Sequence, residues 1–187
     1  DVRDPDEVES VGNQILDDFE TVDVVVNNAG INRDNLAVFM TDEEWHDVLA
    51  TNLYGPFYVV RQFLTTMLAN RFGRIINISS VGATGTTGQI NYAASKAGLV
   101  GLTRTLAKEY GAKGITANNV VLGWFETEMT KDSMPEATQK FWMDLCPKRR
   151  TGHLSEVTSV VRFLASEEAE FVNGTDIPVT GGLDHAP

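Results

Sequence analysis

The sequence lacks the features that mark several specialised classes of protein. It has one cysteine, Cys146, so it can form no intramolecular disulfide and no cysteine-rich metal site. Its three histidines, His46, His153 and His185, show no metal-ligand spacing. No apolar run approaches the roughly 18 residues of a membrane-spanning helix. We therefore expect no metal site and no membrane partner, and the low cysteine content suits a cytoplasmic location.

Positive charge is also scarce. The chain has 15 lysine and arginine residues against 26 aspartate and glutamate residues, which gives a net charge of −11. An acidic excess of this size argues against a nucleic-acid partner, because phosphate backbones need basic contacts. The length of 187 residues and the hydrophobic content of 42% instead suit a single globular domain over residues 1–187.

Short β-branched runs alternate with longer helical patterns along the chain. We predict strands at 22–26, 74–78, 115–121 and 176–179, and helices at 5–19, 41–70, 91–110, 135–145 and 155–165. Asp4, Thr41 and Ser155 are the predicted helix caps, and Gly55-Pro56 predicts a kink. Strands that alternate with helices predict a parallel sheet covered on both faces, with its ligand site at the carboxyl ends of the strands.

A glycine-rich segment follows the second predicted strand. Gly82, Gly85 and Gly88 form G-x-x-G-x-x-G, which superficially resembles a dinucleotide-binding turn. That fingerprint needs two glycines only two residues apart at its start. We therefore interpret this segment as a loop beside a site and not as a phosphate cradle.

The stronger chemical signal follows this loop. Tyr92 and Lys96 are four residues apart on a predicted helix, so their side chains share a face. A lysine ammonium near a phenol is expected to lower the pKa of the tyrosine and to make it a general acid. The pair alone is common, and its alternative interpretation is a solvated helical pair.

Other residues add to this signal. Ser79 and Ser80 end the preceding strand, where a hydroxyl could bind a carbonyl oxygen. Asn52 lies inside a helix, at a position that its helix propensity disfavours. The small residues at 28–30 (Asn-Ala-Gly) would let a flat ring or a ribose approach the backbone. Taken singly, these features would be a strand end, a surface residue and an ordinary turn.

Together these motifs resemble the short-chain dehydrogenase/reductase family. The matching segments are Val-Val-Asn-Asn-Ala-Gly at 25–30, Asn52, Ile-Ser-Ser at 78–80, Tyr-Ala-Ala-Ser-Lys at 92–96 and Gly-Trp-Phe-Glu-Thr at 123–127. The segments at 30–35, 88–92 and 114–118 are most similar to 3-oxoacyl-acyl-carrier-protein reductases and acetoacetyl-CoA reductases. The resemblance implies an α/β fold with a Rossmann-like, doubly wound parallel sheet. The sheet's first three strands would lie upstream of Asp1.

The resemblance also implies four catalytic roles. Tyr92 would protonate the substrate carbonyl oxygen, and Ser80 would hold that oxygen. Lys96 would bind the nicotinamide ribose and tune Tyr92, while Asn52 would position a water that connects Lys96 to solvent. The loop between Ser80 and Tyr92 is one residue shorter than usual, so counting back from Tyr92 would select Ser79 instead. We prefer Ser80, because loops absorb deletions more readily than strands.

Further residues are implied for the cofactor and the substrate. The cofactor set is Asp1, Val2, Asn28, Ala29, Gly30, Tyr92, Lys96, Gly123, Phe125 and Thr127, and the expected cofactor is NADP(H) in preference to NAD(H). The substrate set is Ser80, Gln89, Arg71 and Lys113, of which Arg71 and Lys113 match basic positions that dock an acyl-carrier protein. The family also implies a homo-tetramer that packs through the helices of Asn52 and Tyr92.

The expected activity is the NAD(P)H-dependent reduction of a 3-oxoacyl thioester, carried by acyl-carrier protein or CoA. Two alternatives stay open at this point. One is a family member that acts on another alcohol or ketone, such as a sugar, a steroid or a small alcohol. The other is a noncatalytic fragment, because the chain begins at Asp1 with no glycine-rich phosphate turn before it.

Overall fold

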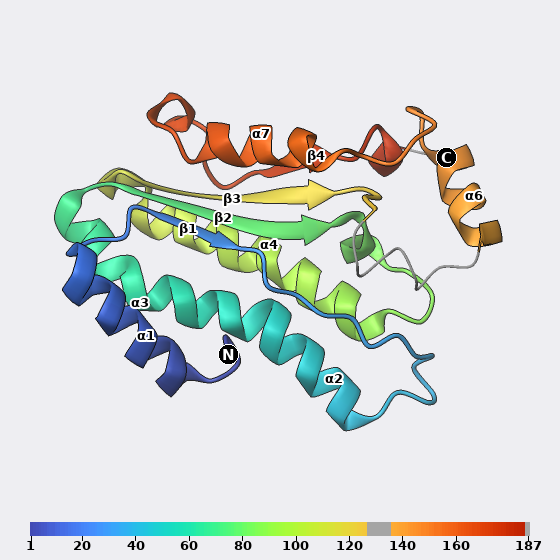
Figure 1. Ribbon diagram of the computed structural model, residues 1–187, viewed down its shortest axis with the longest axis horizontal. Helices are drawn as coiled ribbons and strands as arrows, with labels where there is room; N and C mark the ends of the chain where they lie inside the picture. Colours follow the sequence, from blue (N-terminus) through green and yellow to red (C-terminus); the bar gives the residue numbers. More distant parts are fainter. Residues whose placement is uncertain (127–135, 186–187) are drawn as a thin grey trace.

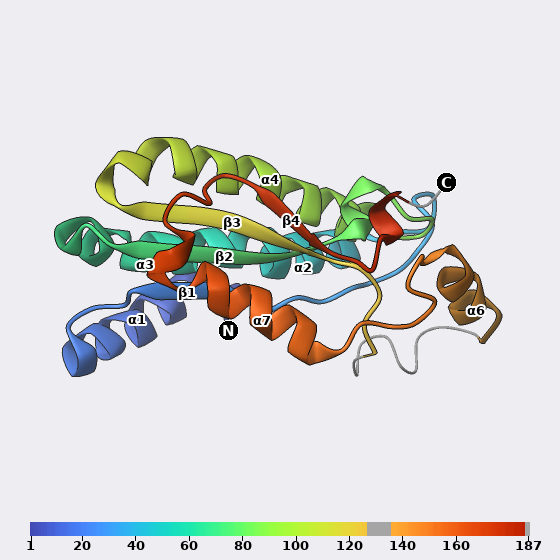
Figure 2. The same ribbon diagram turned by 90° about the horizontal axis from the view of Figure 1, so that it is seen from above.

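The fold is built on a four-stranded parallel sheet. The computed structural model describes residues 1–126 and 136–185, with backbone alone at 136–138 and 185. Its strands β1 (Val24–Asn27), β2 (Gly73–Ser80), β3 (Ile115–Leu122) and β4 (Asp176–Val179) lie side by side in that order, all parallel (Figures 1 and 2). The predicted parallel sheet is therefore confirmed. Pro178, which has no N–H to donate, lies on β4, an edge strand of the described sheet.

Helices cover both faces of this sheet. One face carries α1 (Pro5–Phe19), α2 (Asp42–Leu49), α3 (Gly55–Asn70) and α4 (Ile90–Tyr110), and the other carries α7 (Leu154–Leu164) (Figure 1). α6 (Glu136–Leu145) lies beyond the carboxyl ends of the strands. Five short turns complete the described chain: η1 (Ala50–Tyr54), η2 (Val81–Thr84), η3 (Gly111–Lys113), η4 (Glu167–Ala169) and η5 (Leu183–His185). None of the described helices is long and apolar enough to cross a membrane.

The helix starts follow from capping. Asp4 accepts hydrogen bonds from the backbone of the first turn of α1, and Thr41 forms a capping box with Glu44, both as predicted. The cap predicted at Ser155 is wrong. The N-cap is His153, because the carboxylate of Glu156 reaches back to the His153 backbone N–H at 2.8 Å.

The predicted kink at Gly55-Pro56 takes the form of a π turn. Residues Ala50–Tyr54 form η1, which joins α2 to α3, and Pro56 lies in the first turn of α3. Pro56 has no N–H for the carbonyl of Asn52, four residues earlier, and its ring would crowd that carbonyl. A wider turn relieves both problems, and it places Asn52 on the inner side of the bend.

Alternation along the strands divides the core into two apolar clusters. Ile75 packs with α3 and α4 through Val60, Phe63 and Leu106. Ile76 and Ile78 point to the opposite face, where they pack with Leu164 of α7. The two clusters confirm that both faces of the sheet are covered.

The last crossover has the opposite hand to the two before it. Each step from β1 to β4 moves in the same direction across the sheet, but α7 lies on the face opposite α3 and α4 (Figure 1). Crossovers between parallel strands are right-handed in nearly all proteins. The connection from β3 to β4 is therefore an exception, and it is what covers the second face.

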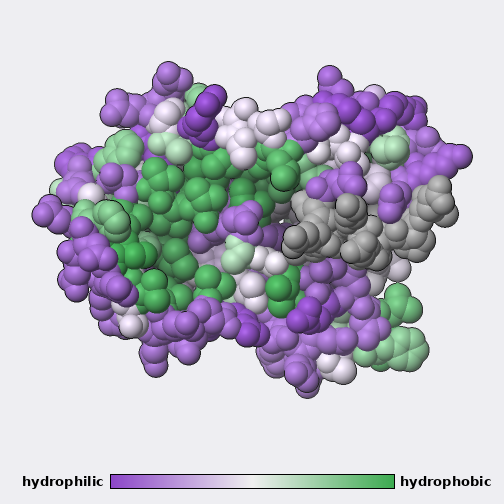
Figure 3. All heavy atoms as spheres, viewed as in Figure 1, coloured by the Kyte–Doolittle hydropathy of each residue, from purple (hydrophilic) through white to green (hydrophobic). Residues whose placement is uncertain are grey.

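The outer edge of β1 is flanked by hydrophobic surface. Figure 3 shows apolar side chains gathered between α7 and α1, over this edge. Val26 of β1 is 42% exposed there. The apolar run Val24–Val26 is nevertheless typical of a strand that is buried on both faces. Among the described strands β1 has a partner on one side only, so its other row of backbone groups is free to pair.

A buried arginine fastens the amino ends of the central strands. The side chain of Arg74 is 2% exposed and donates to the carbonyl oxygens of Ser166, Gly73 and Gly114 at 3.1–3.2 Å. Its guanidinium also lies 4.2 Å from the centre of the Phe72 ring. Burial lowers the pKa of Arg74 from its ordinary value, while Glu170 and Glu167 oppose that change.

We expect Arg74→Met to lower the free energy of unfolding by about 2–4 kcal/mol, because three carbonyl groups lose a charged donor. Urea denaturation would measure this loss. The control is Arg162→Met on the exposed surface of α7, which should change stability by less than about 0.5 kcal/mol. Equal effects of the two variants would show that Arg74 does not fasten the strands.

Candidate active site

The predicted catalytic residues and the turn at residues 28–30 meet at the carboxyl edge of the sheet. Residues 28–30 follow β1, Ser80 ends β2 and Gly123 follows β3, so the parallel pairing brings them to one edge. α4 begins at this same edge, at Ile90, and carries Tyr92 and Lys96 beneath the strand ends. The fold alone therefore assembles the cluster that the sequence motifs predict.

The hydroxyl groups of Ser80 and Tyr92 lie together. The Ser80 side chain lies close enough to the Tyr92 phenol to influence its pKa, and the Ser80 hydroxyl accepts from the Gly82 N–H at 3.0 Å. A Cβ atom on Gly82 would lie 3.3 Å from both the Ser80 Oγ and a ring carbon of Tyr92, so only glycine fits comfortably between them. Ser79 is instead buried, with its hydroxyl 3.5 Å from the Lys96 carbonyl oxygen. Of the two serines, Ser80 is the one that faces Tyr92.

Lys96 is buried beneath the end of β2. Its side chain is 5% exposed, and its ammonium donates to the carbonyl oxygen of Ile78 at 2.7 Å. Burial lowers the pKa of Lys96 to about 8. The Nζ atom lies 5.7 Å from the centre of the Tyr92 ring.

The expected lowering of the Tyr92 pKa by Lys96 is wrong for this structure. Burial raises the pKa of Tyr92 from its ordinary value; the hydrogen bond from Ser80 works in the opposite direction, and Asp34 adds to the increase. Burial opposes the phenolate, and the Lys96 ammonium is directed at a backbone carbonyl. Tyr92 is therefore held in its protonated form, as a proton donor requires.

Asn52 is a buried clamp and not a surface residue. Its Oδ1 accepts from the Ile31 N–H, and its Nδ2 donates to the Ile31 carbonyl oxygen, both at 2.9 Å. The same Nδ2 lies 3.2 Å from the Ser95 hydroxyl on α4. Asn52 thus joins the π turn, the segment after residues 28–30 and the helix that carries Tyr92.

Asn91, which the sequence analysis missed, is a second clamp on that segment. It is fully buried; its Oδ1 accepts from the Tyr92 N–H at 2.7 Å, and its Nδ2 donates to the carbonyl oxygens of Arg33 and Glu44 at 2.9 and 3.1 Å. Gln89 adds a hydrogen bond to Asp34 at 2.9 Å. The available signal was an amide side chain directly before Tyr92 at a helix start.

The predicted cofactor residues differ in their surroundings. Asn28 and Ala29 are exposed, and a Cβ on Gly30 would lie 3.4 Å from the Asn52 Oδ1 and 3.6 Å from the Lys96 Nζ. This turn therefore presents small residues beside Lys96, which suits a flat ring. Gly123 is required for a different reason, since its Cβ would lie 2.7 Å from the Thr180 Cα.

The remaining predicted cofactor residues are Phe125, Thr127, Asp1 and Val2. Phe125 is 6% exposed, with its ring packed against Gly152. Thr127 lies outside the described residues. Val2 lies in a turn before α1, and its side chain packs against Gly55.

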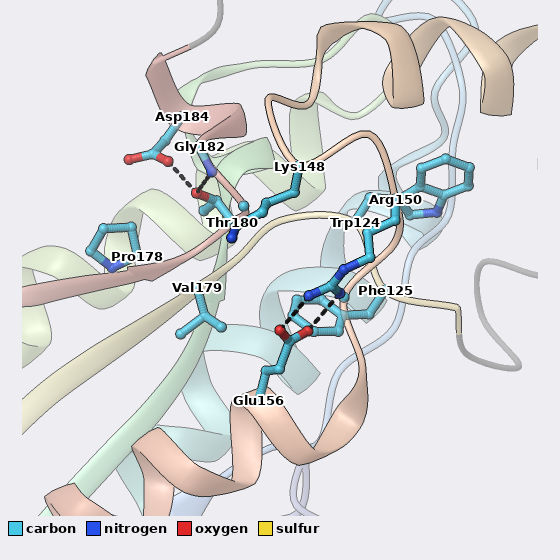
Figure 4. Close-up of a pocket in the computed structure, with 12 residues that line it drawn as sticks. Trp124, Phe125, Lys148, Arg150, Glu156, Pro178, Val179, Thr180, Gly182 and Asp184 are labelled. Carbon is cyan, nitrogen blue, oxygen red and sulfur yellow. Dashed lines mark hydrogen bonds and ion pairs between the residues drawn. The ribbon is translucent and has the colours of Figure 1, made fainter.

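A pocket of about 370 Å³ lies between the ends of β3 and β4 and the start of α7 (Figure 4). Of the predicted site residues, Phe125 lines it, but Ser80, Tyr92 and Lys96 do not. Arg150 and Glu156 form a two-point ion pair at its rim, at 2.6 and 2.8 Å. The hydrogen bond from Arg150, helped by the His153 backbone, lowers the pKa of Glu156 to about 2. Lys148 and Asp184 also line the pocket, so its lining contains two basic and two acidic side chains.

The predicted carrier-docking residues lie far from Tyr92 within one chain. Arg71 follows α3 and donates to the Ala112 carbonyl oxygen at 3.2 Å, which brings it beside Lys113. Both precede β2 and β3, whereas Ser80 ends β2. The eight residues of β2 span about 23 Å at the usual rise of a strand, which separates the two sites.

Comparison with known proteins agrees with this geometry. The family model described as enoyl-(acyl carrier protein) reductase matches residues 1–184. The chain belongs to the short-chain dehydrogenase/reductase family. It is therefore an NAD(P)-dependent oxidoreductase that acts on carbonyl or hydroxyl groups, and its cofactor is a nicotinamide nucleotide.

Several relatives share one description, 3-oxoacyl-[acyl-carrier-protein] reductase FabG. The chain is 45% identical to the Haemophilus influenzae protein over 183 residues, which covers 97% of this chain and 75% of that protein. It is 50% identical to the Pseudomonas aeruginosa protein over 161 residues, which covers 86% of this chain and 65% of that protein. A gluconate 5-dehydrogenase from Burkholderia cenocepacia, solved with NADP and tartrate, aligns with a TM-score of 0.95 and 32% identity, over 100% of this chain and 74% of that one.

The buried Lys96 predicts a pH dependence of stability. Its pKa is about 8 in the folded protein against 10.5 ordinarily, so between these values the unfolded chain binds more protons. We expect the free energy of unfolding to rise from pH 8 to pH 10.5, relative to Lys96→Met. Urea denaturation of both proteins across this range measures the difference, and parallel pH curves would contradict the assignment.

Proposed function

We propose that the protein reduces a 3-oxoacyl thioester, carried by acyl-carrier protein or CoA, to the 3-hydroxyacyl product. The observation that carries this proposal is the pair of hydroxyl groups on Ser80 and Tyr92, placed above Lys96. Two convergent hydroxyl donors suit a carbonyl oxygen that becomes negative during reduction. The FabG relatives, which are 42–50% identical, favour a 3-oxoacyl substrate.

Tyr92 is the proposed proton donor. Its raised pKa keeps the phenol protonated until negative charge develops on the bound oxygen. Ser80 orients that oxygen through its own hydroxyl. A bound nicotinamide cofactor supplies the hydride, and residues 28–30, of which Asn28 and Ala29 are exposed, would hold its ring beside Lys96.

Lys96 and Asn52 are proposed to serve proton return. Lys96 donates one N–H to the Ile78 carbonyl oxygen, so its remaining N–H groups can bind ribose hydroxyls. Asn52, whose side chain is hydrogen-bonded to the backbone of Ile31, is proposed to position a water that connects Lys96 to solvent.

NADP(H) is the proposed cofactor in preference to NAD(H). The support is the bound NADP of the similar gluconate 5-dehydrogenase structure. Gly123, Phe125 and Thr127 are proposed to line the nicotinamide end, and Asp1 and Val2 the adenine end. Gln89, tied to Asp34 near Tyr92, is proposed to contact the substrate.

Arg71 and Lys113 are proposed to dock the carrier for a second copy of the chain. They lie at the opposite end of the sheet from Tyr92, so a carrier held there cannot reach the active site of the same chain. α3 and α4 carry an apolar groove of about 380 Å³ lined by Leu53, Tyr54, Phe57, Tyr58 and Leu102. Antiparallel packing of two copies across this groove would bring the docking residues of one beside Tyr92 of the other. We propose this packing as one contact of a homo-tetramer.

We expect Tyr92→Phe to lower kcat for acetoacetyl-CoA reduction by roughly 10²- to 10⁴-fold, because the proton donor is lost. NADPH consumption measures the rate, and fluorescence titration should show unchanged cofactor affinity. Ser80→Ala should lower kcat while retaining Tyr92 as donor. Near-normal turnover by Tyr92→Phe would rule out its proposed role.

Charge reversal tests the docking surface. The double variant Arg71→Glu/Lys113→Glu should raise KM for a carrier-bound thioester by about tenfold or more, because acidic carrier is repelled. KM for acetoacetyl-CoA should stay within about twofold, since CoA needs no protein docking. Arg162→Glu on α7 is the matched surface control. An equal rise for both substrates would contradict carrier docking.

Oxidation of a hydroxy acid or sugar acid is the second candidate function. The gluconate 5-dehydrogenase likeness favours it, because the whole chain superposes on that enzyme. Assays of acetoacetyl-CoA reduction and gluconate oxidation on one preparation separate the two. Activity with gluconate alone would replace the proposed function.

A further inference from the structure

A row of polar side chains crosses the whole sheet. Asn27, Asn77, Asn119 and Asp176 are register partners on β1, β2, β3 and β4, so their Cα atoms lie opposite one another. We call these four residues, with Thr103 of α4, the asparagine row. Asn77, Thr103 and Asn119 have no exposed surface.

The row is continuously hydrogen-bonded. Asn27 donates to Asn77 at 2.7 Å, and Asn77 donates to the Thr103 hydroxyl at 2.8 Å. Thr103 donates to Asn119 at 2.6 Å, and Asn119 donates to the Asp176 carboxylate at 2.6 Å. Every step therefore runs in the same direction, from β1 toward β4.

Asp176 sets that direction. An ionised carboxylate only accepts, so Asn119 must present its NH₂ group to Asp176 and its carbonyl to Thr103. The Thr103 hydroxyl, which donates to Asn119, must then accept from Asn77, and Asn77 in turn must accept from Asn27. These groups are buried. Rotating one side-chain amide by 180° would therefore leave two donors facing each other without acceptors, which would lower the stability of the fold.

The row ends where the proposed cofactor turn begins. Asn27 is the last residue of β1 and immediately precedes residues 28–30. Ser79, two residues beyond Asn77 on the same face of β2, contacts the Lys96 backbone. The row is thus the layer directly beneath the proposed nicotinamide site, while Asp176 is on the far edge strand.

We propose that Asp176 is a positioning residue for the cofactor turn. Its carboxylate selects one orientation of the asparagine row, and the row holds Asn27 and the turn after it in place. This inference rests on the proposed nicotinamide site at residues 28–30. It assigns Thr103 and Asn119 the same indirect role, without contact to substrate or cofactor.

The test replaces Asp176 with asparagine, which keeps the shape but can either donate or accept. We expect Asp176→Asn to raise the dissociation constant and KM for NADPH by about fivefold or more, with kcat within about twofold. In NMR spectra of asparagine-labelled protein, the Asn27 side-chain amide resonance should shift, although three other residues separate it from Asp176.

Arg104 provides the matched control. It donates to the other Asp176 oxygen at 2.9 Å from the exposed surface of α4, outside the row. Arg104→Gln breaks the same ion pair from its other side and should leave NADPH affinity and the Asn27 resonance unchanged. If Arg104→Gln reproduces the effect, or if Asp176→Asn changes neither quantity, the inference is wrong.

A second pair of variants interrupts the row at its centre and decides the question if Asp176→Asn does not fold. Thr103→Val removes the hydroxyl and should weaken NADPH binding, whereas Thr103→Ser retains the hydroxyl and should restore it. Equal behaviour of the two would refute the row's role. Cofactor titration and NMR measure binding and do not need turnover. If the wild-type protein fails to reduce acetoacetyl-CoA, the proposed function is wrong, but the test of the asparagine row still applies.

Discussion

Parallel pairing of β1, β2 and β3 is the constraint on which the rest of the structure depends. Since each strand must return through a crossover, all carboxyl ends meet at one edge, and residues far apart in sequence become neighbours there. The same constraint sends Arg71 and Lys113 to the opposite edge, because both precede strands. One topological rule therefore separates the candidate active site from the candidate docking residues.

Several buried polar groups near the candidate site bind backbone atoms or one another, which fixes their positions. Asn52 and Asn91 each bond backbone atoms of the segment at 31–33, and Lys96 bonds the Ile78 carbonyl. Each buried amide is nearly saturated with partners, so it has one favoured orientation. Asn28 and Ala29 are exposed at this edge of the sheet, so a ligand can approach there.

The sequence predicted the strands well, because strands buried between two helix layers have continuous β-branched runs, as at Ile75 and Ile76. Helical spacing also predicted the shared face of Tyr92 and Lys96. The direction of the Tyr92 pKa was predicted wrongly, since charges can be counted in a sequence but burial cannot. The sequence analysis did not single out Asn77 and Asn119, because only strand register reveals that they are partners.

The π turn at Ala50–Tyr54 also bears on how the chain tolerates change in length. Such a turn contains one residue more than an α-helical turn. Deleting a single residue there would restore a regular helix and rotate everything before it by about 100° relative to α3. The Asn52 side chain would then lose its hydrogen bonds to Ile31, and α2 would lose its packing against α4. The helical stretch from Asp42 to Asn70 is therefore intolerant of insertions and deletions, although its surface substitutions face no such limit.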